Sequence, residues 1–251
     1  EIDQCKPDGV HVHNFFPLLS PSIYDDCRES NVPVVQTLHN YRTICAGALL
    51  MRNGKICEDC ITGSPHRAVL HRCYKESAIG SFAVARMVDK HRSQGTWNNK
   101  VNRFIALTEF AKGKFVDAGF PADKIQIKSN FVQDDPAASD RAHIQKKGAL
   151  FVGRLSVEKG VATLLRTWAN LDIPLRVAGE GPLDKGVTEF VGKTVTALGS
   201  LDKDSVRKEM RGAEFLVMPS EWHETFGMVL IEAFSQGLPV IASRLGGMAE
   251  I

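Results

Sequence analysis

The sequence predicts an α/β protein of two domains, the second of which is built on a parallel, doubly wound sheet. The chain has 251 residues with 43% hydrophobic content, enough for two domains that each bury a core. In the second half, near-continuous apolar runs alternate with helical patterns, as expected for strands buried on both faces of a parallel sheet. Such sheets bind ligands beyond the carboxyl ends of their strands, so a site is expected in the loops there.

The first half also alternates apolar runs with helical spacing. Strands are expected at VHVH (10–13), PVVQTLH (33–39) and RFIALT (103–108), and helices at 20–30, 78–94 and 109–119. The stretch that follows residue 135 is polar, contains Pro136 and lacks apolar periodicity, which is typical of an interdomain connection. We therefore predict a first domain over 1–135, a linker over 136–147 and a second domain over 148–251.

Five strands are expected in the second domain. They are GALFVG (148–153), PLRVAG (174–179), KTVTALG (193–199), AEFLVMPS (213–220) and LPVIAS (238–243). At the carboxyl ends of the first four stand GRLSVEKG, GEGPL, LGSLD and PSEWHETFG, all rich in glycine, charge or hydroxyl groups. These four loops are the predicted binding edge of the sheet.

Composition excludes some classes of protein. The formal net charge is +2 without a block of one sign, which excludes the basic surface of a nucleic-acid-binding protein. No apolar run approaches the roughly 20 residues that span a bilayer, and the start EIDQCKPDG has neither a basic n-region nor an apolar h-region. The sequence favours a cytoplasmic location, with the inner face of the membrane as an alternative.

GRLSVEKG, at 153–160, suits a diphosphate. Gly153 permits a sharp turn after the strand, while Arg154 and Lys159 can project a planar fork and a point charge over the crevice. The alternative is a plain strand–turn–helix with solvated charges. Gly179 and Gly181 end the next strand in a tight turn. This turn can bring the backbone close to a ligand, and the alternative is a turn without a binding role. Neither segment matches the Walker or the dinucleotide pattern, so ATPase and dinucleotide functions are weakly supported.

HETFGMVLIEAFSQG carries two carboxylates around an expected helix start. Glu224 falls in the loop, and Glu232 lies inside a helix expected to run over 228–236 and to end at Gly237. Eight residues on one helix separate two side chains by about 12 Å along the axis, so the carboxylates cannot share a proton or a metal. The helix start at 226–227 suits an anion, and the carboxylates then bind neutral hydroxyls on either side of it.

These motifs carry a family resemblance. GRLSVEKG, GEGP, PSEWHETFGMVLIEAFSQGLPVIAS and GGMAEI resemble, in order and spacing, the carboxyl-terminal domain of retaining GT-B glycosyltransferases of family 4, the group 1 glycosyl transferases with the E-x7-E motif. The resemblance implies two Rossmann-like domains that face a cleft. It also implies transfer of a sugar from a nucleotide-diphosphate sugar to an acceptor hydroxyl with retention of configuration, and no cofactor for catalysis.

The resemblance assigns roles residue by residue. Arg154 and Lys159 contact the diphosphate, Glu224 the hydroxyls of the donor sugar and Glu232 the ribose. The backbone amides of Phe226, Gly227 and Met228 lie near phosphate and sugar. Two cations and a helix terminus then do for the leaving diphosphate what a divalent ion does in other enzymes.

The first half resembles the acceptor-side domain of the same family. VHVHNFFPLLSPSIY and VVQTLHNYR match its strand–loop–helix segments, and His39 takes the place of the family's histidine near the reacting centre. A lone histidine at a strand end is otherwise more often structural. His11 and His13 are interpreted as a structural pair, with His13-Asn14 as a weaker site candidate. The family-level acceptor is a saccharide or a lipid-linked molecule, and peripheral membrane association is compatible with it.

The family's usual beginning and end are not found in this sequence. The glycine-rich loop over the donor phosphates is absent, because Glu1 already falls just before an internal strand. The chain also stops at Ile251, where further elements of the second domain are expected. Both domains are therefore expected to be incomplete, which puts the activity of this chain by itself in doubt.

The cysteines cluster within an insertion over 45–73. The spacing Cys45-x11-Cys57-x2-Cys60-x12-Cys73 can hold a structural zinc as a tetrahedral thiolate site, with His66 and His71 as spare ligands. Two alternatives stay open, namely reduced buried thiols and disulfide or redox use. Cys5 and Cys27 are expected to be buried as small apolar residues. Some members of the resembled family carry such an insertion beside the acceptor cleft.

Two functions from different classes remain. The first is the retaining glycosyltransferase, and the alternative is a non-catalytic binding or regulatory module in which a zinc-bearing cysteine element docks a partner. A third, a sugar-nucleotide epimerase, needs acidic groups for proton abstraction, and no carboxylate beyond Glu224 and Glu232 suggests it. The nucleotide, the sugar and the acceptor are not determined by the sequence.

Overall fold

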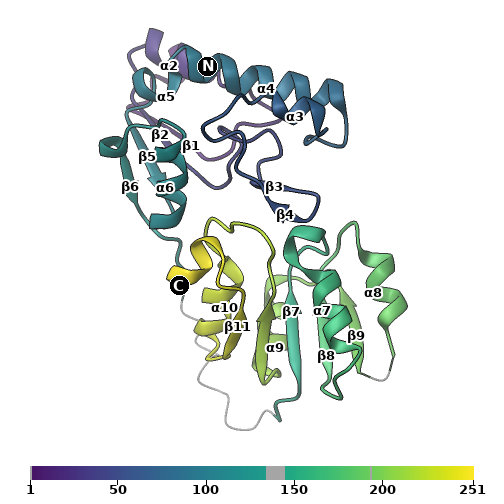
Figure 1. The fold of residues 1–251 in the computed structure, drawn as a ribbon. Helices are drawn as coiled ribbons and strands as arrows, with labels where there is room; N and C mark the ends of the chain where they lie inside the picture. Colours follow the sequence, from purple (N-terminus) through teal and green to yellow (C-terminus); the bar gives the residue numbers. More distant parts are fainter. Residues whose placement is uncertain (1, 134–144, 193) are drawn as a thin grey trace. The chain divides into compact units, whose positions relative to one another are not determined.

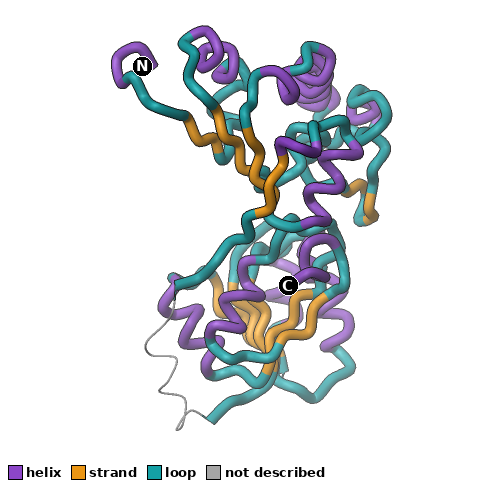
Figure 2. The backbone as a smooth tube through the Cα atoms, turned by 90° about the vertical axis from the view of Figure 1, so that its left-hand side faces the viewer, coloured by secondary structure: helices purple, strands orange, loops and turns teal. Residues whose placement is uncertain are grey.

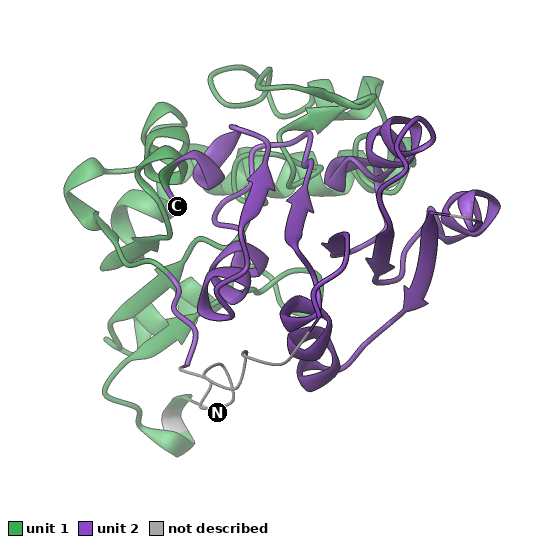
Figure 3. Ribbon diagram, turned by 90° about the horizontal axis from the view of Figure 1, so that it is seen from below, with its two compact units in different colours: residues 1–129, 250 green, residues 130–249, 251 purple. Residues whose placement is uncertain are grey.

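The structure is a computed structural model that describes residues 2–133, 145–192 and 194–251. The chain divides into two compact units, residues 1–129 with 250 and residues 130–249 with 251, which are coloured separately in Figure 3. We call them unit 1 and unit 2. The predicted linker over 136–147 lies for the most part outside the described residues, so it stays a prediction.

Unit 1 contains a four-stranded parallel sheet in the order β1-β2-β5-β6. The strands are β1 (Val10–Val12), β2 (Val34–Thr37), β5 (Arg103–Ala106) and β6 (Ile125–Ile127). The first three lie where the sequence predicts them. The fourth was not predicted, because three residues between two lysines are too few for periodicity to indicate a strand.

The helices of unit 1 include the three that were predicted. They are α1 (Ile2–Cys5), α2 (Ile23–Glu29), α3 (Arg67–Leu70), α4 (Ala78–Ser93), α5 (Thr96–Asn99), α6 (Glu109–Asp117) and the 3-10 turn η1 (Ala122–Lys124). The predictions for α2, α4 and α6 are confirmed. The starts of α4 and α6 follow from capping, since the Ser77 side chain accepts a hydrogen bond from the Gly80 amide and the Thr108 side chain accepts one from the Ala111 amide.

The cysteine-containing insertion forms a short hairpin that is fastened to α4. Strands β3 (Met51–Arg52) and β4 (Lys55–Ile56) pair antiparallel, and Asn53 and Gly54 between them both have positive φ, as a two-residue hairpin turn requires. The guanidinium of Arg92, near the end of α4, donates to the carbonyl oxygens of Cys60, Ile61 and Gly63. The half-buried Arg92 therefore joins the insertion to α4.

Unit 2 contains a five-stranded, all-parallel sheet in the order β11-β10-β7-β8-β9. Most of its elements are labelled in green to yellow in Figure 1, and strands are orange in Figure 2. The strands are β7 (Ala149–Val152), β8 (Leu175–Ala178), β9 (Val195–Gly199), β10 (Phe215–Met218) and β11 (Val240–Ala242). The five predicted strands and the parallel, doubly wound sheet are confirmed. Burial on both faces holds for the three central strands, whereas the edge strands β9 and β11 are partly exposed, with Ile241 60% accessible.

The helices of unit 2 cover both faces of its sheet. They are α7 (Val161–Trp168), α8 (Asp184–Phe190), α9 (Lys203–Arg211) and α10 (Met228–Ser235), with 3-10 turns η3 (Val157–Lys159) and η4 (Gly246–Glu250). Phe151 belongs to a core cluster with α7 and α8, and its neighbour Leu150 belongs to a cluster with α9 and α10. Successive strand residues point to opposite faces, so one strand serves two cores and fixes the edge where its loops gather.

Candidate active site

The loops that follow β7 and β8 are joined by their backbones. The Gly153 amide donates to the Ala178 carbonyl oxygen at 3.0 Å, and the Leu155 amide to the Glu180 carbonyl oxygen at 3.0 Å. The Leu183 amide returns to the Leu155 carbonyl oxygen at 2.9 Å. The two glycine-containing segments singled out in the sequence therefore form one rigid ledge at the carboxyl edge of the sheet.

Glycine is required in this ledge because the two backbones touch. Gly179 has a φ of 140°, and a Cβ there would lie 1.9 Å from the Gly153 carbonyl oxygen. A Cβ at Gly181 would lie 2.4 Å from the Leu155 carbonyl oxygen. The tight turn predicted at these glycines is present. It brings the backbone of this loop close to the backbone of the neighbouring loop after β7.

Arg154 projects from the same ledge with its charge available. The residue is exposed, and within the described parts of the chain its guanidinium makes no hydrogen bond or ion pair. An exposed, unpaired guanidinium has five donors in a planar fork, which suits the oxygens of a phosphate. The predicted position of Arg154 at the sheet edge is compatible with that use.

Lys159 and Glu224 form an ion pair. Nζ of Lys159 contacts Oε1 of Glu224, and the Ser220 hydroxyl donates to the same oxygen at 3.0 Å. Glu224 is only 5% exposed. The ammonium of Lys159 also lies 5.5 Å from the centre of the Trp222 ring. The sequence assigned the two charges to different parts of a donor molecule, and the structure places them in direct contact at one point.

The loop around Glu224 is held by Gly246 and Gly247, to which the sequence analysis gave no role of their own. The Gly247 amide donates to the Glu224 carbonyl oxygen at 2.7 Å. A Cβ at Gly246, where φ is 60°, would lie 2.6 Å from that same oxygen. The paired glycines of GGMAEI were the sequence signal that could have indicated this role. The buried Ser220, a neutral hydrogen-bond donor to the carboxylate, was also not predicted.

Helix α10 begins at Met228, as predicted. The preceding Gly227 has a φ of 102°, and no side chain caps the first turn. Phe226 is buried, whereas Met228 is 38% exposed. An uncapped helix start offers backbone N–H groups and a partial positive charge to an anion.

Glu232 lines a separate cavity of about 420 Å³ together with Met228, Lys203 and Arg207. Burial raises the pKa of Glu232, and the positive charges of Lys203 and Arg207 oppose that rise. Glu224 is not among the described residues that line this cavity. The two glutamates of the motif thus serve different places, as their spacing on either side of a helix start predicts.

His39 lies in unit 1, at the end of β2, within a group of three histidines. Nδ1 of His13 lies 2.8 Å from Nε2 of His39, and Nε2 of His11 lies 2.8 Å from Oγ1 of Thr37. His11 and His13, interpreted from the sequence as a structural pair, have ring centres 4.2 Å apart, and each forms a hydrogen bond with a residue at or beyond β2. Burial, followed by the charges of His13 and His11, lowers the pKa of His39, which favours the neutral ring.

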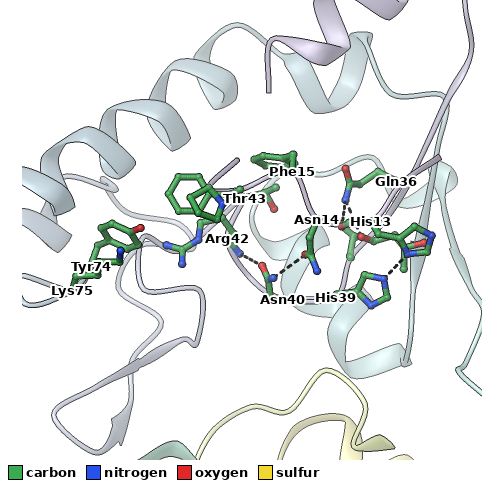
Figure 4. Close-up of a pocket in the computed structure, with 14 residues that line it drawn as sticks. His13, Asn14, Phe15, Gln36, His39, Asn40, Arg42, Thr43, Tyr74 and Lys75 are labelled. Atoms are coloured by element: carbon green, nitrogen blue, oxygen red, sulfur yellow. Dashed lines mark hydrogen bonds between the residues drawn. The ribbon is translucent and has the colours of Figure 1, made fainter. Parts of the chain in front are cut away.

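The same histidines border a cavity of about 300 Å³ in unit 1 (Figure 4). The Asn40 amide donates to Oδ1 of Asn14 at 3.1 Å, and the Gln36 amide donates to the His13 carbonyl oxygen at 3.1 Å. Residues 13–17 and 36–43 supply most of the wall. His13-Asn14, the weaker candidate from the sequence, lies in this cavity beside His39.

The cysteines of the insertion are neighbours without a metal-binding arrangement. All six thiols of the chain are free, and burial together with the thiols of Cys45, Cys73 and Cys57 raises the pKa of Cys60 to about 11. Within the described residues, no group of three or more His, Cys, Asp or Glu side chains is arranged to hold a metal ion. The structural zinc at these four cysteines is thus not supported here and stays a prediction.

Two smaller expectations have different outcomes. Cys27 is buried as predicted, but Cys5 is exposed because it ends the short helix α1.

Among the described residues, no helix is both long enough and apolar enough to cross a membrane.

Comparison with known proteins connects unit 2 to a family. Residues 146–251 match the family model described as glycosyl transferases, group 1. An uncharacterized glycosyltransferase of Methanocaldococcus jannaschii is 40% identical over 106 residues, which are 41% of this chain and 30% of that protein. An uncharacterized 42.6 kDa protein in the cps region of Klebsiella pneumoniae is 26% identical over 260 residues, covering 100% of this chain and 61% of its own.

Solved structures share the fold. HepE of Anabaena, crystallised in complex with UDP-glucose, matches with a TM-score of 0.60 and 19% identity over 90% of this chain and 57% of its own. Sucrose-phosphate synthase of Thermosynechococcus elongatus matches with a TM-score of 0.68 and 20% identity over 98% of this chain and 58% of its own. The chain is an α/β protein with parallel sheets and the GT-B glycosyltransferase fold.

The comparisons agree with one another. The family model matches residues 146–251 alone, and the structural neighbours, at 19% and 20% identity, show a shared fold. The chain spans less than two thirds of the length of these relatives, from 30% to 61%.

Proposed function

We propose that the chain belongs to a retaining glycosyltransferase that moves a sugar, a hexose in our proposal, from a nucleotide-diphosphate sugar to an acceptor hydroxyl. The observation that carries the proposal is the contact of Lys159 with the buried Glu224 at the carboxyl edge of the unit 2 sheet. A cation for the leaving diphosphate and a carboxylate for sugar hydroxyls then meet where sugar and phosphate join. Both residues fall within the segment that matches the glycosyltransferase family model.

The leaving diphosphate is stabilised by positive charge in three forms. Arg154 is an exposed fork, Lys159 is a half-buried ammonium, and helix α10 presents an uncapped amino terminus. Charge that develops on the departing phosphate in the transition state is best stabilised by donors that are already in place. These groups supply the charge, so we propose that catalysis requires no divalent ion.

The proposed sugar transfer needs no nucleophile from the protein. The acceptor oxygen forms a bond to the anomeric carbon on the face from which the diphosphate leaves, the bond from that carbon to the phosphate oxygen breaks, and the acceptor proton passes to the departing phosphate. Glu224, as an ionised carboxylate, only accepts hydrogen bonds, so it orients sugar hydroxyls. Its place in the loop is held by Gly247 and Ser220.

The cavity beside Glu232 is the proposed site of the nucleoside. Its volume of about 420 Å³ falls within the range of small-molecule sites, and it opens beside Met228 at the start of α10. The carboxylate of Glu232 offers acceptor oxygens to the two hydroxyls of a ribose. The fold neighbour HepE was crystallised with UDP-glucose, which supports a nucleotide-sugar donor of this kind.

A panel of nucleotide sugars tests the proposed function. Thermal unfolding of the complete protein is measured with uridine, guanosine and adenosine diphosphate sugars, and zinc content is measured on the same preparation. We expect one donor to stabilise the protein by about 2.7 kcal/mol at a hundred times its dissociation constant.

The same measurements separate the enzyme from the alternative. Stoichiometric zinc without stabilisation by any nucleotide sugar would favour the binding or regulatory module with a structural zinc at the four cysteines. Stabilisation by a donor, whatever the zinc content, would contradict that module as the whole function. Retention is read from the anomeric configuration of the product, and an inverted product would contradict the mechanism above.

A surface of unit 1 supports the proposal that the protein acts in the cytoplasm at the inner face of a membrane, on a saccharide or a lipid-linked acceptor. Leu70 is 82% exposed at the end of α3, and Ile79 and Phe82 are 84% and 49% exposed on α4. Helices α3 and α4 pack together, and the Phe82 ring lies 5.9 Å from that of His66, one turn from Leu70. The exposed Arg67 and Arg86 border this apolar patch on the same two helices.

Vesicle binding tests the patch. The double variant Ile79→Asp with Phe82→Asp should lose co-sedimentation with vesicles of anionic lipid, because it removes apolar area and repels the headgroups. Phe190→Asp, which changes an exposed apolar residue of unit 2, is the matched control and should bind like the wild type. Equal binding of both variants would contradict a membrane role for the patch.

The six free thiols support a reducing compartment.

A further inference from the structure

We propose that the 300 Å³ cavity of unit 1 is a subsite for an oxyanion carried by the acceptor, a phosphate or a carboxylate on the sugar. That the ligand is an acceptor rests on the proposed function. That it carries an oxyanion rests on the side chains that line the cavity (Figure 4).

The described lining of the cavity is cationic. It consists of His13, Asn14, Phe15, Phe16, Pro17, Gln36, Thr37, Leu38, His39, Asn40, Arg42, Thr43, Tyr74 and Lys75. Two of these residues carry a permanent positive charge, and none of them is a carboxylate. A pocket with two cations and no counter-charge in its described wall attracts an anion and disfavours a cation.

Arg42 is fixed in place without a carboxylate partner among the described residues. Its guanidinium lies 4.7 Å from the centre of the Phe16 ring and 5.1 Å from that of the Tyr74 ring, and Nη1 donates to the Ala46 carbonyl oxygen. Burial lowers the pKa of Arg42, which shows that the half-buried charge has lost solvation. An oxyanion beside the remaining N–H donors restores the lost interactions, and the fixed fork needs no reordering to receive it.

Tyr74 brings the second cation close to the first. The ammonium of Lys75 lies 5.6 Å from the centre of the Tyr74 ring, the ring that Arg42 also contacts. Figure 4 shows Arg42, Tyr74 and Lys75 together at one end of the cavity, with His13 and His39 at the other. Like charges that share one ring repel each other, and an anion between them removes that repulsion.

Thr43 supplies an independent indication of a missing partner. Thr43 is only 5% exposed, and its hydroxyl has no hydrogen-bond partner among the described residues, although it lines the cavity. Buried hydroxyls without a partner are uncommon in folded proteins, because leaving one unsatisfied costs stability. A ligand oxygen in the cavity can accept a hydrogen bond from the Thr43 hydroxyl.

The middle of the cavity can read a sugar. Asn14 and Asn40 lie between the two ends in Figure 4 and are hydrogen-bonded to each other, so their remaining amide groups are donors and acceptors for ring hydroxyls. The subsite therefore orients a charged sugar with its oxyanion at Arg42 and Lys75. An uncharged sugar would leave the two cations without a partner.

Calorimetric titration of the complete protein tests the subsite without requiring turnover. The probes are glucose 6-phosphate, glucuronate and glucose, each titrated with saturating nucleoside diphosphate so that the cations of unit 2 are occupied. We expect at least one charged sugar to bind ten times more tightly than glucose. The tighter of the two charged probes tells whether the acceptor carries a phosphate or a carboxylate.

Variants connect the preference to this cavity. Lys75→Glu reverses the charge of an exposed residue and should abolish the tenfold preference, whereas Lys55→Glu, on β4 outside the cavity, should retain it. Thr43→Val removes the unpaired hydroxyl and should weaken binding of the charged probe about threefold or more without lowering the melting temperature. Glucose binding should be the same in all of these proteins.

Three outcomes overturn the inference: equal binding of charged and neutral sugars, an unchanged preference in Lys75→Glu, or equal loss of preference in Lys55→Glu. The result is distinguishable from failure of the proposed function. If no nucleotide sugar binds but the charged preference disappears with Lys75→Glu, the oxyanion site stands and the glycosyltransferase proposal fails. If a donor binds and no preference is seen, only this inference fails.

Discussion

Replacing Lys159 by alanine in the complete protein is expected to lower the rate of sugar transfer by about 10²- to 10³-fold, the usual cost of one preorganised group that stabilises leaving-group charge. The variant removes the cation that contacts Glu224, while the Ser220 hydroxyl still donates a hydrogen bond to that 5% exposed carboxylate. The loss should therefore appear mainly in kcat, because the charge that Lys159 neutralises develops in the transition state. Steady-state kinetics with the preferred donor measure it.

Matched variants separate chemistry from folding. Glu224→Gln keeps the shape and should also reduce transfer strongly, because an amide replaces one of the acceptor oxygens that face the sugar. Lys185→Ala, at an exposed position in α8, should behave like the wild type in rate and in melting temperature. Turnover at the wild-type rate by Lys159→Ala or Glu224→Gln, with a folded protein, would show that the ion pair has no part in catalysis.

The fold was predictable where chain periodicity is strong. The strand β7 is a short apolar run between two glycines, β10 is one that ends at Pro219, and α10 has a glycine on each side, so both type and position follow from local chemistry. The three-residue β6 and the hairpin of β3 and β4 were not predicted. Their pairing depends on neighbours far along the chain or on one turn, and strands this short carry no periodic signal.

The site was predictable by position more than by contact. Arg154 and Lys159 were expected at the carboxyl edge of the sheet because topology alone brings them there. The contact of Lys159 with Glu224 spans 65 residues, and no local pattern encodes such a distance. The cationic cavity of unit 1 was missed for the same reason, since Arg42 and Lys75 come together only through the ring of Tyr74.

Gly179→Ala is expected to destabilise unit 2 by more than about 4 kcal/mol, a large part of the 5–15 kcal/mol that holds a typical domain. The added Cβ would lie 1.9 Å from the Gly153 carbonyl oxygen, and the φ of 140° is one that alanine rarely adopts. Backbone atoms on both sides would have to separate, which breaks the hydrogen bonds that join the two loops. Urea unfolding followed by hydrogen exchange of peptides from 148–183 measures the loss within unit 2.

Gly186→Ala is the matched control, and its expected effect has the opposite sign. Gly186 lies inside α8, and a Cβ there meets no atom within 4 Å. Alanine restricts the unfolded chain and favours the helix, so the free energy of unfolding should rise by roughly 0.5–1 kcal/mol. If both variants lowered stability equally, the loop contact at Gly179 would not be the cause, and the ledge that carries Arg154 would not depend on that glycine. A specific loss in Gly179→Ala, with donor binding lost along with it, would establish that the ledge positions the diphosphate site.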